Sequence, residues 1–294
     1  GCVRGGQQAW RDTLLLYPDG AARKAEYPDG REQWRKSDQT GNLYPDPDMR
    51  LRRYLGGGRL EQDGEWHCEY DADGNLTERY LGTGRWLDGK KDRWRYRWNA
   101  DGSLAKVVRP DKREVEFTYD ALGRRLSKSF GTTVTRWVWN GNVPLHQWKQ
   151  HREYSVMEDR WNTDTEHRDM TVWLFDEDSF VPVAMIKEGR SYSILTDQLG
   201  TPTEAYDTEG NEVWSRVLDM DGNVIEETGN KGMVPFCSRG SIMTGRLGWH
   251  TTGSGITHRR WECMYRKIRL GWLVEYSICM GMSMIPTIGW MCWD

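Results

Sequence analysis

The sequence lacks a basic excess, a long apolar run and a set of paired cysteines. Its 294 residues carry 41 Lys and Arg against 44 Asp and Glu, which leaves a net charge of -3. Nucleic-acid-binding domains normally show a basic excess, so we predict no nucleic-acid partner. No stretch approaches the 18 or more apolar residues of a membrane span, and residues 1–4, Gly-Cys-Val-Arg, do not have the layout of a signal peptide.

Catalytic and metal-binding signatures are missing as well. Only two of the six Cys lie in the first 236 residues, where they form neither a CxxC site nor a readable disulfide framework. No G-x-S-x-G, P-loop, H-E-x-x-H or Rossmann fingerprint occurs, and the six His have no partner at metal-ligand spacing. We therefore predict that the chain is not an enzyme, with no catalytic residue, no bound metal and no cofactor.

Two segments superficially resemble calcium loops. Residues 71–75 and 219–223 both read Asp-x-Asp-Gly-Asn. An EF-hand loop needs a bidentate Glu at its twelfth position, and these positions are Gly82 and Asn230. We interpret both segments as turns.

The chain is rich in aromatic residues and glycine. Its mean hydropathy of -0.82 is low for a folded domain, but 17 Trp and 13 Tyr argue against disorder, because disordered chains are poor in aromatics. Together with 32 Gly, this composition indicates many short strands that are joined by tight turns.

A short unit recurs along residues 17–223: an aromatic residue, one or two polar residues, and then Asp-Gly or a related Gly-containing turn. Asp-Gly is a strong hairpin signal, because Gly adopts positive φ without a Cβ clash and Asp caps the turn locally. The predicted turn residues are Tyr70, Asp71, Gly74, Asp101, Gly102, Tyr119, Asp120 and Gly123.

The flanks of these turns alternate with a period of two, as half-buried strands do. The aromatic residues of 94–98 interleave with Arg. Val115, Phe117 and Tyr119 interleave with Glu and Thr in the same way, and Val213, Ser215 and Val217 form a weaker case. Helical periodicity is nearly absent; residues 152–159 are the one stretch left open. We predict an all-β fold in which hairpins stack into a long sheet, with the aromatic stripes as packing faces rather than stacking platforms for sugars or single strands.

These turns resemble the YD repeats of bacterial RHS proteins, which also occur in teneurins and in the shells of insecticidal toxin complexes. The best match is 192–227, and the resemblance extends over roughly residues 40–230, although Leu-Asp-Met-Asp-Gly at 218–222 departs from the usual Tyr-Asp-Ala-Trp/Phe-Gly. The residues that fall on the RHS-core pattern are Tyr192, Asp197, Leu199, Gly200, Thr201, Pro202, Asp207, Gly210 and Trp214.

The resemblance implies a spiralling sheet of antiparallel YD-repeat β-hairpins that forms part of a hollow shell. It also implies an encapsulated C-terminal toxin domain, missing here, that is released after autoproteolysis by an acidic site in a closing block. A secretion apparatus component and a chaperone are further implied partners. The intact protein is expected to be secreted or surface-exposed through specialised secretion, and to act in intercellular competition. The alternative is a cell-surface YD-repeat adhesion or carbohydrate-binding protein.

The composition changes after Phe236. The first 236 residues have a net charge of -7, whereas the last 58 have a net charge of +4 and contain four of the six Cys and half of the 12 Met. The closing block expected from the resemblance, which begins near RFxGQYYDxETGLxYNRxRYYxP, is absent from this tail in its own frame. Codons permitted for the tail, read one base out of frame, spell a series that begins LFQGQYYDRETGLAYNRFRYYSP.

We therefore hypothesise that a one-base deletion near Phe236 shifted the frame. Residues 1–236 are then a shell segment, and residues 237–294 are an aberrant, disordered tail. A tail that is itself a small toxin would need a polar catalytic cluster, but it offers only Glu262, Glu275, His250 and His258, without recognisable spacing. We expect the chain to be a fragment and poorly soluble, because part of a shell leaves apolar faces and sheet edges open.

Overall fold

The computed structural model describes residues 13–16, 22–27, 29–82, 89–238, 241–244, 249–252 and 255–258. The chain divides into two compact units. Unit 1 comprises Gly1–Leu51 with Arg266–Asp294, and unit 2 comprises Arg52–Tyr265. All the regular elements of the described residues are β-strands, so the predicted all-β fold is confirmed. Within this described part, no helix is long and apolar enough to cross a lipid bilayer.

The described part of unit 1 contains five short strands in two small sheets. The first sheet joins β1 (Thr13–Leu16), β2 (Ala22–Glu26) and β3 (Glu32–Trp34), and the second pairs β4 (Lys36–Ser37) with β5 (Leu43–Tyr44).

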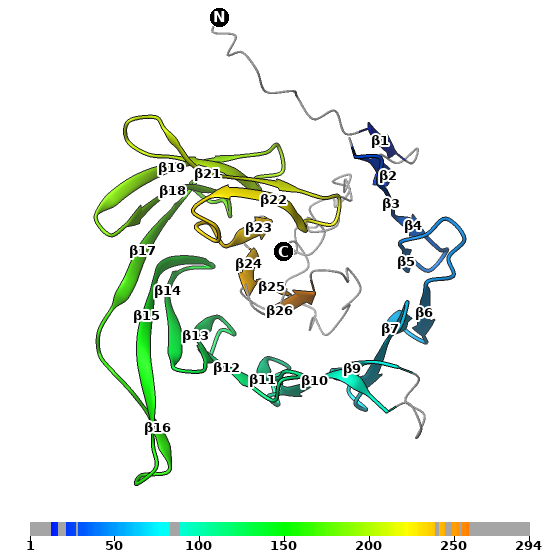
Figure 1. Ribbon diagram of the computed structural model, residues 1–294, viewed down its shortest axis with the longest axis horizontal. Helices are drawn as coiled ribbons and strands as arrows, with labels where there is room; N and C mark the ends of the chain where they lie inside the picture. Colours follow the sequence, from blue (N-terminus) through cyan, green and yellow to red (C-terminus); the bar gives the residue numbers. More distant parts are fainter. Residues whose placement is uncertain are drawn as a thin grey trace, which may run out of the picture. The chain divides into compact units, whose positions relative to one another are not determined.

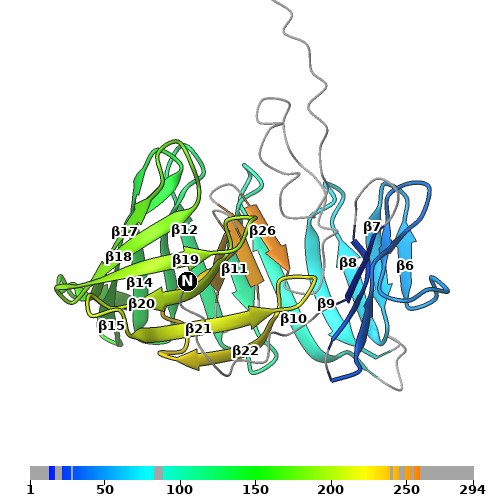
Figure 2. The same ribbon diagram turned by 90° about the horizontal axis from the view of Figure 1, so that it is seen from above.

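Unit 2 is built around one sheet of 17 strands, β6 to β22. Strands that are consecutive in sequence pair antiparallel, as expected for stacked hairpins, and the sheet curves through the unit (Figure 1; Figure 2 gives the view from above). The strands are β6 (Arg52–Leu55), β7 (Arg59–Asp63), β8 (Trp66–Tyr70), β9 (Leu76–Leu81), β10 (Lys91–Trp98), β11 (Leu104–Val108), β12 (Glu114–Tyr119), β13 (Arg125–Phe130), β14 (Thr133–Asn140), β15 (Val143–Ser155), β16 (Arg160–Thr163), β17 (Arg168–Phe175), β18 (Pro182–Lys187), β19 (Arg190–Thr196), β20 (Pro202–Tyr206), β21 (Glu212–Leu218) and β22 (Val224–Gly229).

The longest strand, β15, has 13 residues and branches the pairing. It pairs with β14, and on its other side with β17 near His146 and with β16 near Tyr154. The stretch 152–159, which the sequence left open, is therefore the end of β15 and the turn into β16.

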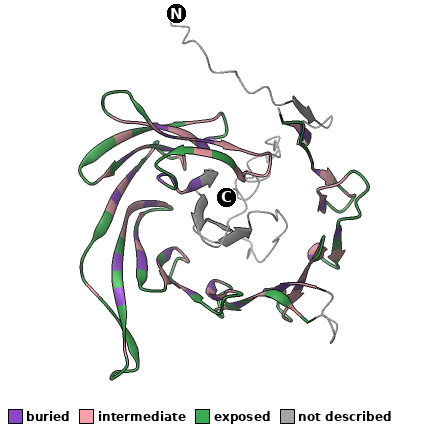
Figure 3. Cartoon of the chain, in the orientation of Figure 1, coloured by how far each residue is buried: buried purple, intermediate pink, exposed green. Residues whose placement is uncertain are grey.

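Burial alternates along the strands, as Figure 3 shows. In β10, Tyr96 is buried while Arg95 and Arg97 are exposed, and in β12, Val115 and Phe117 are buried while Glu114 is exposed, which confirms both predicted stripes. The third predicted stripe, Val213 with Ser215 and Val217, is wrong. The buried residues of β21 are Trp214 and Arg216, because the segment after β22 packs against that face of β21.

Two hydrophobic clusters form the core of unit 2. The first spans β7 to β12 and contains the buried side chains of Leu60, Cys68, Leu76, Tyr96, Leu104, Val107, Val115 and Phe117. The second joins β17 to β21 with the segment after β22, and it contains Trp173, Met185, Ile194, Ala205, Trp214, Met233, Val234 and Phe236.

A separate four-stranded antiparallel sheet comes after the main one. It contains β23 (Phe236–Ser238), β24 (Ser241–Thr244), β25 (Trp249–Thr252) and β26 (Gly255–His258). Except for Phe236, these strands fall in the segment that we interpret as out of frame, and their side chains, like residues 259–294, lie outside what the structure describes. The frame shift and the disordered tail therefore stay predictions, and Glu262 and Glu275 lie outside the described residues.

Candidate functional site

The recurring turn is closed by two backbone hydrogen bonds of its first residue, one with the fifth residue and one with the fourth. Between β8 and β9, the Asp71 N–H donates to the carbonyl of Asn75 (3.0 Å), and the Gly74 N–H donates to the carbonyl of Asp71 (3.1 Å). Gly74 has φ of 82°, in the left-handed region that residues with a Cβ rarely adopt. A three-residue hairpin loop that ends in such a glycine explains why Gly recurs at the fourth position of the unit.

The carboxylate that caps this turn belongs to its first aspartate, Asp71, rather than to Asp73 before the glycine. Asp71 accepts hydrogen bonds from the backbone N–H and the side-chain amide of Asn75, at 2.8 and 3.0 Å. Asp120 likewise accepts from the N–H of Arg124 at 2.8 Å. Burial raises the pKa of both aspartates, but these hydrogen bonds outweigh it and hold each pKa below its ordinary value.

A second form of the turn does use the aspartate before the glycine. Between β10 and β11 the first position is Asn99, and Asp101 accepts from the backbone N–H and the hydroxyl of Ser103, at 2.8 and 2.7 Å. Gly102 comes next, with φ of 83°. Either aspartate of the unit can therefore cap the loop; the sequence analysis named Asp71 and Asp120 as turn residues but assigned the cap to the aspartate before the glycine.

The aromatic residue before each turn has a polar role that the sequence analysis missed. In four copies its O–H or indole N–H donates to a backbone carbonyl within the first two residues of the preceding strand. The pairs are Tyr70 with Leu60 (2.8 Å), Trp98 with Leu76 (2.7 Å), Tyr119 with Leu104 (3.0 Å) and Trp139 with Arg125 (2.7 Å). Tyr and Trp are interchangeable here because both combine an apolar ring with a donor at its tip, and their alternation at this position is the signal in the sequence.

Residues 192–214 form β19, β20 and part of β21 with the two turns between them. Trp214 is fully buried in the second cluster, and Tyr192 packs against that cluster from β19. The Trp214 indole N–H donates to Glu227 Oε1 at 2.7 Å. The structure thus brings the first and last residues of the predicted RHS-core motif to one cluster.

The first turn of this segment joins β19 to β20. Asp197 accepts from the N–H groups of Leu199 and Thr201, at 2.9 and 2.8 Å. Gly200 has φ of 78°, and Pro202 is buried as the first residue of β20. These motif residues build a hairpin turn, and Leu199 is half-exposed at its tip.

In the next two turns, the pKa values of the capping aspartates are shifted in opposite directions. Asp207 accepts from the backbone N–H of Asn211 at 2.9 Å, with Gly210 at φ of 82°, and this hydrogen bond lowers the pKa of Asp207. Asp219 accepts a similar bond from Asn223 at 2.7 Å, but burial prevails and raises the pKa of Asp219. Asp219 lies in the turn where the sequence departs from the YD pattern.

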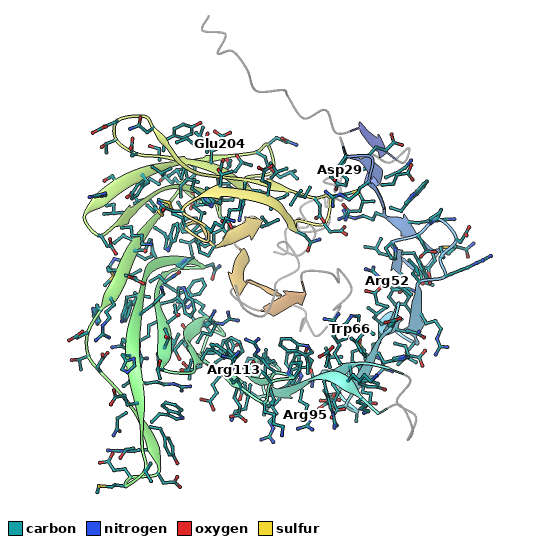
Figure 4. The ribbon with its side chains drawn as sticks, in the orientation of Figure 1. Asp29, Arg52, Trp66, Arg95, Arg113 and Glu204 are labelled. Carbon is teal, nitrogen blue, oxygen red and sulfur yellow. The ribbon has the colours of Figure 1, made fainter. Side chains whose placement is uncertain are left out.

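The two faces of the main sheet carry different chemistry. Within unit 2, Trp66 lies on the inner side of the curved sheet and Arg95 on its outer side (Figure 4). We call these sides the concave face and the convex face. Trp66 packs against the first cluster, so the apolar and aromatic side chains of β7 to β12 line the concave face.

Several arginines are buried among these aromatic rings, which the sequence analysis also missed. Their guanidinium groups stack on ring faces, where the ring quadrupole attracts a cation. The pairs are Arg79 with Trp66 (3.9 Å to the ring centroid), Arg125 with Phe117 (4.6 Å) and Arg216 with Trp214 (5.0 Å). No pattern in the sequence separates these arginines from exposed ones such as Arg95.

The convex face is solvated and of mixed charge. Lys90 forms ion pairs with Glu69 (2.7 Å) and Glu78 (2.9 Å), and Lys106 pairs with Glu114 (2.7 Å). Burial raises the pKa of Glu78, but its bonds to cationic neighbours prevail and lower it. Because opposite charges pair in this way, the convex face does not carry an electrostatic potential of one sign.

The side chains described above pack in the core or cap the turns. No three His, Cys, Asp or Glu side chains in this part of the chain come together as a metal site. The Cys68 thiol lies in the first cluster, where burial raises its pKa to about 12, so it is protonated and unreactive at neutral pH. Together, these contacts build a curved sheet whose inner face is apolar.

Known proteins resemble the chain in sequence over part of its length. The chain is 30% identical over 87 residues to the probable deoxyribonuclease RhsB of Dickeya dadantii (29% of this chain and 6% of that protein). It is 30% identical over 117 residues to the double-stranded DNA deaminase toxin A of Burkholderia cenocepacia (35% and 8%). The chain thus spans less than a tenth of the length of these relatives.

Solved structures with a similar arrangement include the Photorhabdus luminescens Tc holotoxin pore and a TcdB2–TccC3 complex. The first has a TM-score of 0.43 and 13% identity, with 84% of this chain and 11% of that chain covered. The second has a TM-score of 0.41 and 12% identity, with 84% and 12% covered.

The family model for the teneurin YD-shell matches residues 38–248. This range takes in the whole 17-strand sheet with its capped turns. The chain therefore belongs to the teneurin YD-shell family.

Proposed function

We propose that this chain is a segment of an RHS polymorphic-toxin shell whose concave face encloses a C-terminal toxin domain of the intact protein. The observation that carries the proposal is the apolar and aromatic face of a continuous curved sheet, which is opposite to a charged convex face. An enclosed domain would lie against this concave face, next to the aromatic residues that flank the buried clusters.

The role that we propose for the chain itself is non-catalytic. Its turns, indole and phenol hydrogen bonds and buried arginines all stabilise the wall. The relatives named as a deoxyribonuclease and a DNA deaminase toxin support a shell that accompanies a toxin. Delivery to competing cells, through a secretion apparatus and with a chaperone, belongs to the same proposal.

We also propose that residues 1–236 are the shell segment and that residues 237–294 are read out of frame. Sequencing the coding DNA tests this proposal directly. The shifted frame must spell the closing block from Cys237 onward. A coding sequence that does not spell it would refute the frame shift and leave the shell proposal to its own test.

Protection of an enclosed domain tests the proposed function. Two proteins are digested with a non-specific protease. One is the gene product with its closing block and downstream domain in frame, and the other is the downstream domain alone. We expect the downstream domain to survive inside the shell and to be degraded alone. Equal rates of degradation would show that the shell encloses nothing.

A second candidate, a surface adhesin that binds carbohydrate, is favoured by one exposed aromatic pair. Tyr154 and Trp161 are 46% and 44% exposed on the hairpin of β15 and β16, with ring centroids 5.4 Å apart. The Arg152 guanidinium lies over the Trp161 ring (4.3 Å to the centroid), and the remaining exposed surface of the pair can stack on an apolar face of a sugar. Binding to a glycan array that W161A abolishes would support adhesion over encapsulation.

A further inference from the structure

The chain reverses direction at the end of β22 and returns to the concave face. Gly229, the last residue of β22, has φ of 66°. A Cβ at this position would lie 2.1 Å from the carbonyl oxygen of Val213, so no other residue fits without a backbone shift. We call residues 229–236 the return segment, and Figure 1 shows that it leads to β23 on the inner side of the curved sheet.

The first half of the return segment is held by backbone and carboxylate hydrogen bonds. The Asn230 N–H donates to the carbonyl of Val213 at 3.1 Å. The Gly232 N–H donates to Glu227 Oε1 at 2.7 Å, and the same oxygen accepts the indole N–H of Trp214 at 2.7 Å. Glu227 thereby links the return segment to the fully buried tryptophan of the second cluster.

The second half of the return segment is held by the guanidinium group of Arg216. This residue is buried, with 5% of its surface exposed. Its Nε donates to the carbonyl of Pro202 at 2.9 Å, and its Nη1 donates to the carbonyl of Val234 at 3.5 Å. Its Nη2 donates to the carbonyl of Phe236. One planar group thus joins the start of β20 to two points of the return segment.

Apolar contacts complete the attachment. Val234 and Phe236 are each 1% exposed. The Phe236 ring meets Trp173 edge to face at a centroid distance of 4.7 Å and lies 5.5 Å from Phe175. Phe236 thereby belongs to the second cluster.

We propose that the return segment is an anchor, positioned by Arg216 and Glu227, that holds the onward chain on the concave face irrespective of the sequence beyond Ser238. The inference rests on the proposed function, which makes the concave face the side of the enclosed domain. The contacts described for the return segment come from β17 and from β20 to β22, all of which precede it in the chain, so we expect the second cluster to stay closed when the chain beyond Ser238 is severed. With such an anchor, the main sheet stays folded whether or not the enclosed domain remains attached.

Hydrogen exchange measured by mass spectrometry on the full chain tests the two positioning residues. In R216Q we expect the amides of residues 230–236 to exchange at least tenfold faster, while peptides from β7 to β12 are unchanged. R97Q, which alters an exposed arginine of β10, is the matched control and leaves residues 230–236 protected. E227A loses this protection and E227Q retains it, because a glutamine oxygen can still accept both N–H groups.

Two exchange results would overturn the anchor. Unchanged exchange of residues 230–236 in R216Q would show that Arg216 does not position them. Faster exchange spread equally through β7 to β12 would show that the substitution acts on the whole fold instead.

Severing the chain tests the separation of wall and enclosed domain. A protease site inserted after Ser238 is cleaved, and the melting temperature is expected to stay within about 2 °C of the uncleaved value. A fall of more than about 5 °C would show that the wall depends on the chain beyond Ser238, and would overturn the proposal. Failure of the proposed function appears differently, as degradation of the downstream domain while residues 230–236 remain protected.

Discussion

The rings of Trp173 and Phe236 meet edge to face, with centroids 4.7 Å apart and planes at 77°. Trp173 lies in β17, in the middle of the main sheet, whereas Phe236 comes after its last strand. The pair therefore ties the end of the sheet back to a strand that precedes it by several hairpins, and Phe236 closes the second cluster from that end.

Truncation of Phe236 should be among the most damaging substitutions in unit 2. We expect F236A to lower the free energy of unfolding by about 3 kcal/mol or more, because it removes a buried ring and leaves a cavity. Urea denaturation measures the change. V138A is the control: Val138 is 44% exposed, and its loss should cost less than about 0.5 kcal/mol. Equal costs for both variants would contradict the packing of the second cluster.

The Tyr119 hydroxyl should stabilise the sheet through one carbonyl. Y119F removes the donor to the carbonyl of Leu104 (3.0 Å), and we expect a loss of about 1 kcal/mol. Y154F serves as control, because the hydroxyl of Tyr154 is on an exposed residue and donates to Asp159 at the surface. Thermal or urea unfolding of the two variants compares them, and a Y119F protein as stable as the parent would disprove the role of the hydroxyl.

Replacing a turn glycine should lower the free energy of unfolding because of its backbone conformation alone. Gly102 has φ of 83° and no atom within 4 Å of a Cβ built on it, so G102A has room but adopts an unfavourable backbone conformation. We expect a loss of about 1–2 kcal/mol. G56A, at a turn glycine with neither positive φ nor close neighbours, should be neutral or slightly stabilising. Equal melting temperatures for G102A and G56A would contradict this account.

One turn of the repeat has lysine where the others have glycine, and it can be improved. Lys112 has φ of 64°, and its N–H donates to the carbonyl of Arg109 at 2.9 Å, as Gly74 does to Asp71. K112G should relieve the left-handed strain and raise the free energy of unfolding by about 0.5–1 kcal/mol. K106G, inside β11, should instead destabilise. A destabilised K112G would show that the lysine side chain contributes more than its backbone costs.

The aspartates of two turns should respond to pH in opposite directions. The folded pKa of Asp120 is lowered from 3.8, so its contribution to stability is present above pH 3.8 and is lost as the pH falls through the folded pKa. The folded pKa of Asp219 is raised from 3.8, so its contribution is present below pH 3.8 and is lost as the pH rises through the folded pKa.

Substitution by asparagine separates these two cases. At pH 7, D120N should lower the melting temperature, because Arg124 loses an ion pair of 2.7 Å, whereas D219N should leave it unchanged or raise it, because a buried charge is removed. At pH 3 both effects should shrink. Melting curves between pH 3 and pH 7 measure them, and the same pH profile for both variants would contradict the assigned pKa directions.

Much of the wall could be predicted from local patterns. The hairpin turns at Gly74 and Gly102 and the buried faces of β10 and β12 depend on a residue and its near neighbours, and the structure has them where the sequence indicates. The pattern was misleading in β21, where Val213 and Val217 suggested one face and the structure buries Trp214 and Arg216 on the other. Aliphatic residues alone did not mark the packed face, because the segment after β22 covers Trp214.

The sequence by itself determined the repeat, the positions of its turns and the all-β class, since positive φ at glycine, capping by aspartate and a period of two act within a few residues. Only the tertiary structure decided which arginines are buried against aromatic rings, and that Glu227 and Arg216 hold the return segment. Most of those contacts join residues of different strands or segments, and strand order and register bring them together. Arg216 and Arg95 carry the same guanidinium group, but packing buries the one among carbonyls of β20 and the return segment and leaves the other on the exposed face near Glu78.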